Sequence, residues 1–271
     1  MLLPVHQPTS FVEARGHRLE HVDIPPQTPD RPELLLLHEG LGSVSMWRDF
    51  PARLAERTGC RTIAYSRAGF GRSSPRAQPF SPRFMHEEAL EILPALREAL
   101  GIRNPVLVGH STGASMALIH AGAAEVAGIV AIAPFAFVET SNLENIRKAK
   151  ERYADMRNRL ARHHDDVDGV FHGWSDLWLD PAFAGWNIDA DLVRIRCPVL
   201  AVLGERDEYC TRAQLDRIAG EATHARVETL VLADCGHSPH RDQPEVILDA
   251  INRFLGTGHN STPDVTCPPT R

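Results

Sequence analysis

Short apolar runs recur along the chain and alternate with longer segments whose apolar residues are spaced as on one face of a helix. A short apolar run bounded by turn-forming residues predicts a buried strand, and the longer periodic segments predict helices. Strands that alternate with helices predict an α/β fold, a mostly parallel sheet with helices on both faces. The expected strands cover residues 10–14, 18–23, 34–37, 62–65, 106–108, 128–133, 197–203 and 227–232, and the expected helices cover residues 47–57, 84–100 (kinked at Pro94), 114–123 and 244–255.

The alternation stops between Pro134 and Cys197. Residues 142–162 are strongly charged and helical in pattern, and an aromatic-rich stretch follows them. An insertion of this size between two strands is compatible with a single domain. The expected division is a core of residues 1–134 and 197–256, a helical lid of residues 135–196 and a disordered tail of residues 257–271.

The segment Gly109–Gly113 has the form Gly-x-Ser-x-Gly and lies between a strand pattern and a helix pattern. A serine at a sharp strand-to-helix turn can act as a nucleophile, because the turn presents its Oγ at the carboxyl edge of the sheet. The flanking glycines allow the strand and the helix to approach closely. Ser111 is therefore the candidate nucleophile, and a role as a simple helix cap is the alternative.

A serine nucleophile needs a base, and the base needs a carboxylate that orients it. Asp207 and His237 each follow a predicted strand later in the chain. The order Ser, Asp, His is typical of one hydrolase architecture, and the carboxyl ends of parallel strands meet at one edge of the sheet. Ser111, Asp207 and His237 are therefore expected to form a catalytic triad. The weaker candidates are Glu205, Glu208 and Asp234 for the carboxylate, and His240, expected at the rim of the site, for the base.

With these motifs the chain resembles the α/β-hydrolase superfamily over nearly its whole length, and in particular its serine carboxylesterase and C–C bond hydrolase branch with a helical cap. Residues 34–43 resemble the family's His-Gly oxyanion loop, and residues 65–73 resemble its Asp-Arg-x-Gly-x-Gly-x-Ser loop. Both depart from the pattern. Ser66 replaces the usual Asp, which is expected to remove only a local structural carboxylate, and Glu39 interrupts the His-Gly pair. The resemblance implies an eight-stranded, mostly parallel sheet with a helical lid insertion.

The resemblance also implies an oxyanion hole. Thr112, which follows the nucleophile, is expected to donate one backbone N–H. The second donor is Leu41 if the Gly-Leu-Gly run sets the register, and Gly40 if the count starts from His38. His38 is expected to hold its loop by hydrogen bonds. Glu39 is interpreted as a solvated loop charge, with contact to a cationic or hydroxylated substrate as the alternative.

Three of the four tryptophans lie in the expected lid, at Trp174, Trp178 and Trp186. Ligand pockets are lined mainly by apolar and aromatic side chains. These tryptophans are therefore expected to shape an apolar substrate pocket over Ser111. The alternative is that they only pack the lid helices against one another and against the core.

Composition narrows the class of protein. The 271 residues are 43% hydrophobic and carry a net charge of −6, which gives no reason to expect nucleic acid or a membrane as partner. The five cysteines are odd in number and lack a Cys-x-x-Cys pair, and the chain starts without a signal-peptide pattern, so a reduced, cytoplasmic protein is expected. Residues 163–166 are the densest metal-ligand candidate, but neighbouring residues of a helix point apart, so no metal and no cofactor is expected. A homodimer stays an open alternative.

These residues predict a serine hydrolase that cleaves a carboxylic ester of a small or medium-sized substrate through an acyl-enzyme on Ser111. Epoxide hydrolases and haloalkane dehalogenases of the family use an aspartate nucleophile, which Ser111 argues against. Carbon–carbon bond hydrolases, lactonases and thioesterases use the same triad. Some members of the fold are non-catalytic binding proteins, which is the alternative from another class.

Overall fold

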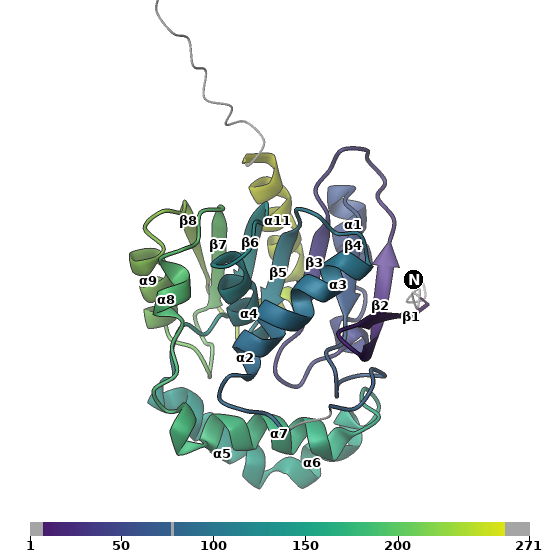
Figure 1. Cartoon of the computed structure of the whole chain (residues 1–271). Coiled ribbons are helices and arrows are strands. Elements are labelled where there is room, and N and C mark those ends of the chain that lie inside the picture. Colours follow the sequence, from purple (N-terminus) through teal and green to yellow (C-terminus); the bar gives the residue numbers. More distant parts are fainter. Residues whose placement is uncertain (1–7, 77–78, 258–271) are drawn as a thin grey trace, which may run out of the picture.

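The computed structural model describes residues 8–76 and 79–257, and its centre is an eight-stranded sheet. The strand order is β1-β2-β4-β3-β5-β6-β7-β8 (Figure 1). The pairs β1–β2 and β2–β4 are antiparallel, and every other pair is parallel. The strands are β1 (Ser10–Ala14), β2 (His17–Ile24), β3 (Leu34–Leu37), β4 (Thr62–Tyr65), β5 (Val106–His110), β6 (Gly128–Ile132), β7 (Val199–Gly204) and β8 (Val227–Leu232).

Helices cover both faces of the sheet, so the predicted α/β-hydrolase fold is confirmed. The α-helices are α1 (Phe50–Thr58), α2 (Phe84–Glu87), α3 (Leu93–Ala99), α4 (Thr112–Ala121), α5 (Thr140–Glu151), α6 (Tyr153–Leu160), α7 (Val167–Leu179), α8 (Asp189–Leu192), α9 (Arg212–Glu221), α10 (Pro239–Asp242) and α11 (Pro244–Thr257). Two 3-10 helices, η1 (Val44–Trp47) and η3 (Pro181–Phe183), and a π-helical segment, η2 (Glu88–Ile92), complete the described elements.

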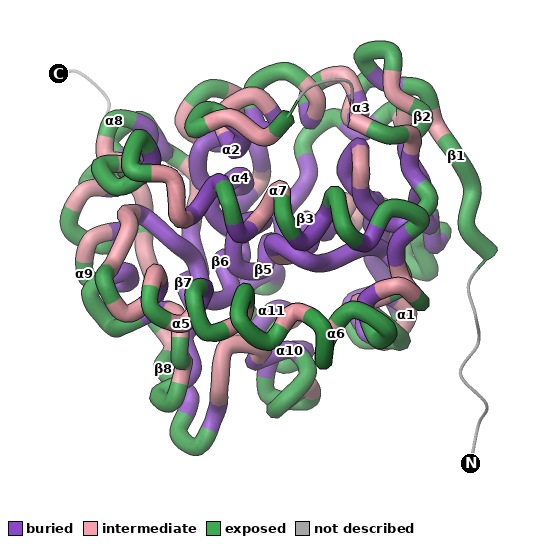
Figure 2. Tube along the Cα trace, turned by 90° about the horizontal axis from the view of Figure 1, so that it is seen from below, coloured by how far each residue is buried: buried purple, intermediate pink, exposed green. Residues whose placement is uncertain are grey.

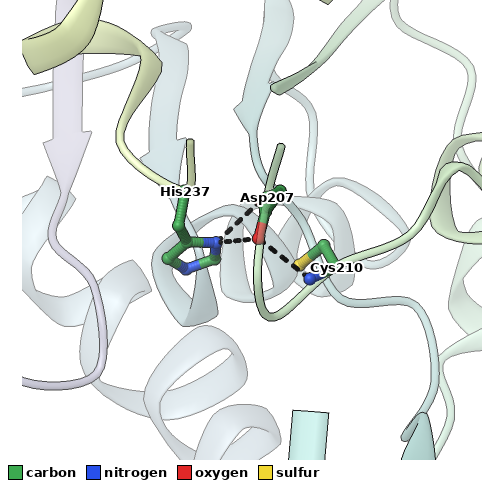
Figure 3. A group of neighbouring side chains, drawn as sticks. All are labelled: Asp207, Cys210 and His237. Carbon is green, nitrogen blue, oxygen red and sulfur yellow. Dashed lines mark hydrogen bonds and ion pairs between the residues drawn. The ribbon is translucent and has the colours of Figure 1, made fainter. Parts of the chain in front are cut away.

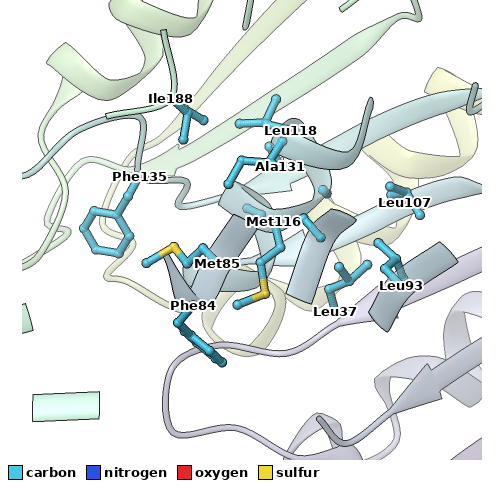
Figure 4. Close-up of a cluster of buried hydrophobic side chains, with 14 of the residues drawn as sticks. Leu37, Phe84, Met85, Leu93, Leu107, Met116, Leu118, Ala131, Phe135 and Ile188 are labelled. Carbon is cyan, nitrogen blue, oxygen red and sulfur yellow. The ribbon is translucent and has the colours of Figure 1, made fainter. Parts of the chain in front are cut away.

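The sheet separates two hydrophobic cores. Along β3, Leu35 and Leu37 face one core while Leu34 and Leu36 face the other, and all four are buried. Successive side chains of a strand point to opposite faces, so a strand buried on both sides reads as a continuous apolar run. Helices α1 and α11 pack on the second face, and α2, α3 and α4 pack on the first. Figure 4 shows part of the first core, including Leu37, Phe84, Met85, Leu107, Met116, Leu118 and Phe135.

The segment between β6 and β7 carries helices α5 to α8. Helices α5, α6 and α7 lie together below the sheet in Figure 1, on the side toward which the parallel strands run. Figure 2 views the molecule from that side and shows these helices exposed on the outside, with β5 and β6 buried behind them. The segment expected as a lid therefore lies over the edge of the sheet where the candidate catalytic residues are.

Two expected helices differ in detail. The helix expected over residues 84–100 is one helical run in which the π-helical η2 lies directly before Pro94. A proline lacks an N–H and clashes with the carbonyl four residues earlier, and a widened turn relieves that clash. The charged helix expected over residues 142–162 is divided at Arg152 into α5 and α6. Apart from Thr257, where α11 ends, the tail expected to be disordered lies outside the described residues.

Candidate active site

Ser111 lies in a sharp turn between β5 and α4. Its backbone has φ 56° and ψ −122°, a region in which a non-glycine residue is strained. A Cβ on Gly113 would lie 2.1 Å from the carbonyl oxygen of Leu37, and one on Gly109 would lie 2.4 Å from the Cα of Ala114. The two glycines are therefore required by the close approach of α4 to β3 and to β5. The strain is located at the residue that the sequence selects as nucleophile.

The structure brings together the three residues predicted as a triad. His237 Nε2 lies 3.0 Å from Ser111 Oγ, and His237 Nδ1 lies 2.8 and 2.9 Å from the two carboxylate oxygens of Asp207. Asp207 Oδ1 also accepts the backbone N–H groups of Tyr209 and Cys210, at 2.8 and 2.9 Å. The Asp207 side chain has no exposed surface, and that of His237 is 13% exposed. The Asp207 carboxylate and the His237 imidazole, which are hydrogen-bonded to each other, are thus largely shielded from solvent.

Charge around His237 favours its protonated form. Burial by itself lowers the pKa of His237, but the hydrogen bond and the charge of Asp207, with the charges of Glu39 and Glu208, outweigh burial and raise the pKa. Among the described residues Asp207 is the carboxylate that hydrogen-bonds to His237, and Asp234 instead pairs with Arg206. His237 can therefore take a proton from Ser111 and hold it, as a general base requires.

Cys210 lies beside Asp207 and His237, and Figure 3 shows the three side chains together. One ligand atom from each lies within 4.8 Å of the other two. His237 Nδ1 and the Asp207 carboxylate are hydrogen-bonded to each other, and burial raises the pKa of the Cys210 thiol well above its ordinary range. A buried neutral thiol is a poor metal ligand because the thiolate is the form that binds. Residues 163–166 are the densest group of metal-ligand residue types in the sequence. There the His164 ring hydrogen-bonds to the backbone N–H of Gly71 and to the carbonyl oxygen of Leu41.

The loop after β3 is held by the buried side chain of Arg67. Its two terminal nitrogens donate to the carbonyl oxygens of His38 and Glu39, at 2.6 and 2.7 Å. His38 Nε2 accepts the backbone N–H of Arg67 at 3.1 Å, so its Nδ1 carries the proton donated to the Glu39 carbonyl oxygen at 2.8 Å. Burial and the charge of Arg67 keep the pKa of His38 well below its ordinary range. His38 thus holds its loop, as expected, and does not act as an acid.

The backbone N–H groups of the expected oxyanion donors differ in their partners. Leu41 N–H donates to the Glu39 carboxylate at 3.1 Å. Neither Gly40 N–H nor Thr112 N–H donates a hydrogen bond to any residue within 8–76 or 79–257. Of the two alternatives for the second oxyanion donor, the structure therefore favours Gly40, because the N–H of Leu41 is already bound to the Glu39 carboxylate.

Glu20 supplies a carboxylate next to Ser66. Ser66 Oγ donates to Glu20 Oε2 at 2.8 Å and accepts the backbone N–H of Val44 at 2.9 Å. The same Glu20 oxygen accepts the backbone N–H of Arg72 at 3.0 Å. The carboxylate expected to be lost at position 66 is thus present, but it comes from β2.

An apolar cavity adjoins Gly40 and Thr112, two of the expected oxyanion donors. It is small, about 10 Å³, with room for about one water molecule. A Cβ on Gly40 would lie 2.5 Å from Trp174, so the indole packs directly on the loop. Trp186 does not line this cavity and stacks on Phe183 at 5.2 Å between ring centres. The residues that line this inner cavity include Gly40, Phe80, Thr112, Trp174, Leu177 and Trp178.

A second cavity of about 10 Å³ lies on the other side of the loop. We call it the histidine cavity, and its walls include Glu39, Met46, Trp47, His110, Ser238 and His240. His110 Nε2 donates to the carbonyl oxygen of His237 at 2.7 Å, and burial lowers the pKa of His110 to about 4. His240 was expected at the rim. That expectation is wrong, because α10 turns the ring inward, where it is 5% exposed and packs on Trp47 and His110.

Glu39 also differs from the first interpretation. Its side chain is half-buried, it lines the histidine cavity, and its charge acts on His237. It is therefore not a solvated loop charge. Sequence reasoning gave no role to Arg67 or to Glu20. The signal available for Glu20 was its place on the same strand face as the buried Val22 and Ile24.

Comparison with known proteins identifies the class. A family model described as "Alpha/beta hydrolase family" matches residues 34–250. This match covers strands β3 to β8, the candidate nucleophile and the loops that carry Asp207 and His237. The chain belongs to the α/β-hydrolase family.

Individual relatives are more distant. A proline iminopeptidase of Lactobacillus helveticus is 29% identical over 145 residues, which is 53% of this chain and 49% of that protein, so the match spans about half its length. The mouse sn-1-specific diacylglycerol lipase ABHD11 is 24% identical over 92% of both chains. The crystal structure of carboxylesterase CesB of Bacillus subtilis superposes with a TM-score of 0.67 at 23% identity, over 93% of this chain and 92% of that one. The superposed structure shares the fold, and the three proteins differ in the activity that their names state.

Proposed function

We propose that the protein is a serine hydrolase that cleaves a carboxylic ester of a small or medium-sized substrate through an acyl-enzyme on Ser111. The observation that carries the proposal is the 3.0 Å contact between His237 Nε2 and Ser111 Oγ, with Asp207 on the far side of the ring. Nucleophile, base and orienting carboxylate are thus within hydrogen-bond reach of one another. The strained backbone of Ser111 adds to this support.

The reaction follows from the geometry. His237 accepts the Ser111 hydroxyl proton as Oγ bonds to the ester carbonyl carbon, and Asp207 stabilises the imidazolium that forms. In this proposal the backbone N–H groups of Gly40 and Thr112 bind the oxyanion, which their lack of a partner among the described residues supports. The bond from the acyl carbon to the alcohol oxygen then breaks, and the alcohol takes the proton from His237. Water, deprotonated by His237, attacks the acyl carbon and releases the acid and Ser111.

The walls of the inner cavity favour an apolar acyl group. Phe80, Trp174, Leu177 and Trp178 surround the space beside Thr112. Phe80 and Leu177 also line a groove of about 540 Å³ between the loop after β4 and helix α7, so a longer acyl chain has room beyond them. We therefore expect short acyl groups to bind in the inner cavity and longer ones to extend toward the groove.

Covalent labelling tests the proposal. The protein is incubated with a fluorophosphonate probe, the modified peptide is identified by mass spectrometry, and p-nitrophenyl acetate and butyrate are assayed on the same sample. Labelling at Ser111 with ester turnover, both lost in Ser111→Ala, is the expected result. Folded protein that neither reacts with the probe nor turns over either ester would overturn the proposal in favour of a non-catalytic binding protein.

Peptide-bond cleavage is the second candidate, because one of the relatives is named proline iminopeptidase. The same sample is therefore assayed with L-proline p-nitroanilide. Turnover of the anilide that exceeds turnover of the esters would replace the ester proposal by this one.

A further inference from the structure

Glu39 is a carboxylate close to the proposed active site, and it has no ion-pair partner among the described residues. Within the described ranges no lysine, arginine or histidine forms an ion pair with its side chain, and Leu41 N–H is the donor that it binds. Arg67 is close by and its charge and that of Glu39 attract each other, but its two terminal nitrogens donate to carbonyl oxygens. A half-buried carboxylate loses hydration, and one hydrogen bond replaces only part of it.

The main chain at Glu39 is fixed, so the carboxylate stays near the site. The carbonyl oxygen of Glu39 accepts hydrogen bonds from Arg67 Nη2 at 2.7 Å, from His38 Nδ1 at 2.8 Å and from Gly42 N–H at 3.1 Å. Arg67 and His38 are themselves buried. The backbone hydrogen bonds of Glu39 therefore hold its negative charge near the proposed active site.

Glu39 lies near the segment that carries the proposed base His237. His237 must give its proton to the departing oxygen, so the alcohol lies beside His237. The histidine cavity contains Glu39 together with Ser238, the residue after His237, and with His240 and Arg241 of α10. Arg241 is exposed, so solvent screens its charge. The charge of Glu39 is also among those that act on His237.

The histidine cavity has further unpaired polar atoms. Trp47 Nε1 and His240 Nδ1 are buried and have no hydrogen-bond partner in the described part of the chain. Trp47 Nε1 is a donor only, so of these two atoms it is an unprotonated His240 Nδ1 that can accept a hydrogen bond from a ligand. The two residues are 4% and 5% exposed. A cavity of about 10 Å³ admits a group the size of one water molecule. A primary ammonium has that size, carries a positive charge and three donors, and is favoured beside an aromatic ring such as that of Trp47.

We propose that Glu39 determines specificity, and that the site prefers esters whose leaving alcohol carries a primary ammonium group bound by the Glu39 carboxylate. This inference rests on the proposed function. With a neutral substrate, the carboxylate repels the negative charge that develops on the oxyanion. A bound ammonium neutralises that repulsion, so a cationic ester reacts faster than a neutral ester of the same shape.

The test compares aminobutyl and aminopentyl butyrate with pentyl and hexyl butyrate, in which a methyl replaces the ammonium. The ratio of kcat/KM for each cationic ester to that of its neutral isostere is measured in the wild type, in Glu39→Gln and in Glu208→Gln. Glutamine at position 39 keeps an acceptor for Leu41 N–H. Glu208 is the matched control, because it is exposed and does not line the cavity but its charge also acts on His237.

We expect the wild-type ratio to exceed unity by about tenfold or more for at least one chain length. Glu39→Gln should bring the ratio to about one, and Glu208→Gln should leave it within about twofold of the wild type. A wild-type ratio near one, or an equal ratio in Glu39→Gln, overturns the inference. Fluorophosphonate labelling of Ser111 separates the two failures: a labelled protein without the preference loses only this inference, and an unlabelled protein without turnover loses the proposed function as well.

Discussion

The guanidinium of Arg67 donates a hydrogen bond to the carbonyl oxygen of Glu39 at 2.7 Å and a second one to the neighbouring His38 at 2.6 Å. Burial lowers the pKa of Arg67 to about 10, opposed by the charges of Glu88 and Tyr65, so the side chain is still protonated near neutral pH. A buried cation therefore fixes the backbone that leads into Gly40. In the proposed mechanism Arg67 is a positioning residue for an oxyanion donor.

Replacing Arg67 by lysine should lower kcat more than it changes KM. Lysine keeps the charge but cannot bridge two carbonyl oxygens with a planar fork. We expect kcat for p-nitrophenyl butyrate to fall by about tenfold to a hundredfold, less than the roughly 10²–10³-fold loss that follows removal of an oxyanion donor. Arg61→Lys is the matched control, since Arg61 precedes β4 and binds Asp23 and Glu33 instead. Equal kcat in Arg67→Lys and the wild type would show that the hydrogen bonds from Arg67 to His38 and Glu39 have no catalytic role.

The contact between Glu20 and Ser66 predicts a reciprocal effect on stability. Glu20→Gln removes the carboxylate that binds Ser66 Oγ and the Arg72 N–H, and should lower the free energy of unfolding by about 1–3 kcal/mol. Ser66→Asp should also destabilise, because it buries a second carboxylate against the first. The double variant restores one carboxylate, so urea unfolding should show less destabilisation than the sum of the single changes. Simple additivity would mean that the two positions are independent.

Much of the fold could be predicted because strands that are buried on both faces of the sheet appear in the sequence as continuous apolar runs. Strands β3, β4 and β8 have the bounds expected from their apolar runs. Helix details were less accurate. Pro94 indicates an irregularity in the helix over residues 84–100, but the sequence does not show that it takes the form of the π-helical segment η2.

The candidate site was predictable where each residue follows a strand. The sequence expectation places Ser111, Asp207 and His237 at one sheet edge, and the structure brings their side chains into hydrogen-bond distance. Contacts between segments far apart in sequence could not be predicted. Glu20 reaches Ser66 across 46 residues of chain, and no local pattern encodes such a contact.

The raised pKa of His237 predicts the acid limb of the pH profile. The base must be neutral to accept a proton, so kcat/KM should rise with pH and reach half its maximum above the ordinary histidine pKa of 6.5. Glu208→Gln removes one of the charges that raise this pKa and should move the midpoint to lower pH. The check is p-nitrophenyl butyrate hydrolysis between about pH 5 and 9. A wild-type midpoint below 6.5 would contradict the assignment of His237 as the base.

The inner cavity predicts how acyl preference changes. Trp174→Ala removes the ring that packs on Gly40 and enlarges the cavity. We expect the kcat/KM ratio of p-nitrophenyl hexanoate to acetate to increase by about tenfold, since burial of each added methylene is worth roughly 1 kcal/mol. Trp186→Ala is the control, because Trp186 stacks on Phe183 and does not line the cavity. The same increase in both variants would mean that loosening of the helices, and not the cavity, sets the preference.

The most direct test of the central claim is to trap the acyl-enzyme. The protein is mixed with p-nitrophenyl butyrate, quenched in acid during turnover, digested and analysed by mass spectrometry, with Ser111→Ala in parallel. The account predicts a butyryl group on Ser111, whose Oγ lies 3.0 Å from His237 Nε2, and none in the variant, which should also lose turnover by about a thousandfold or more. A butyryl group on another residue, or turnover that persists in Ser111→Ala, would contradict it.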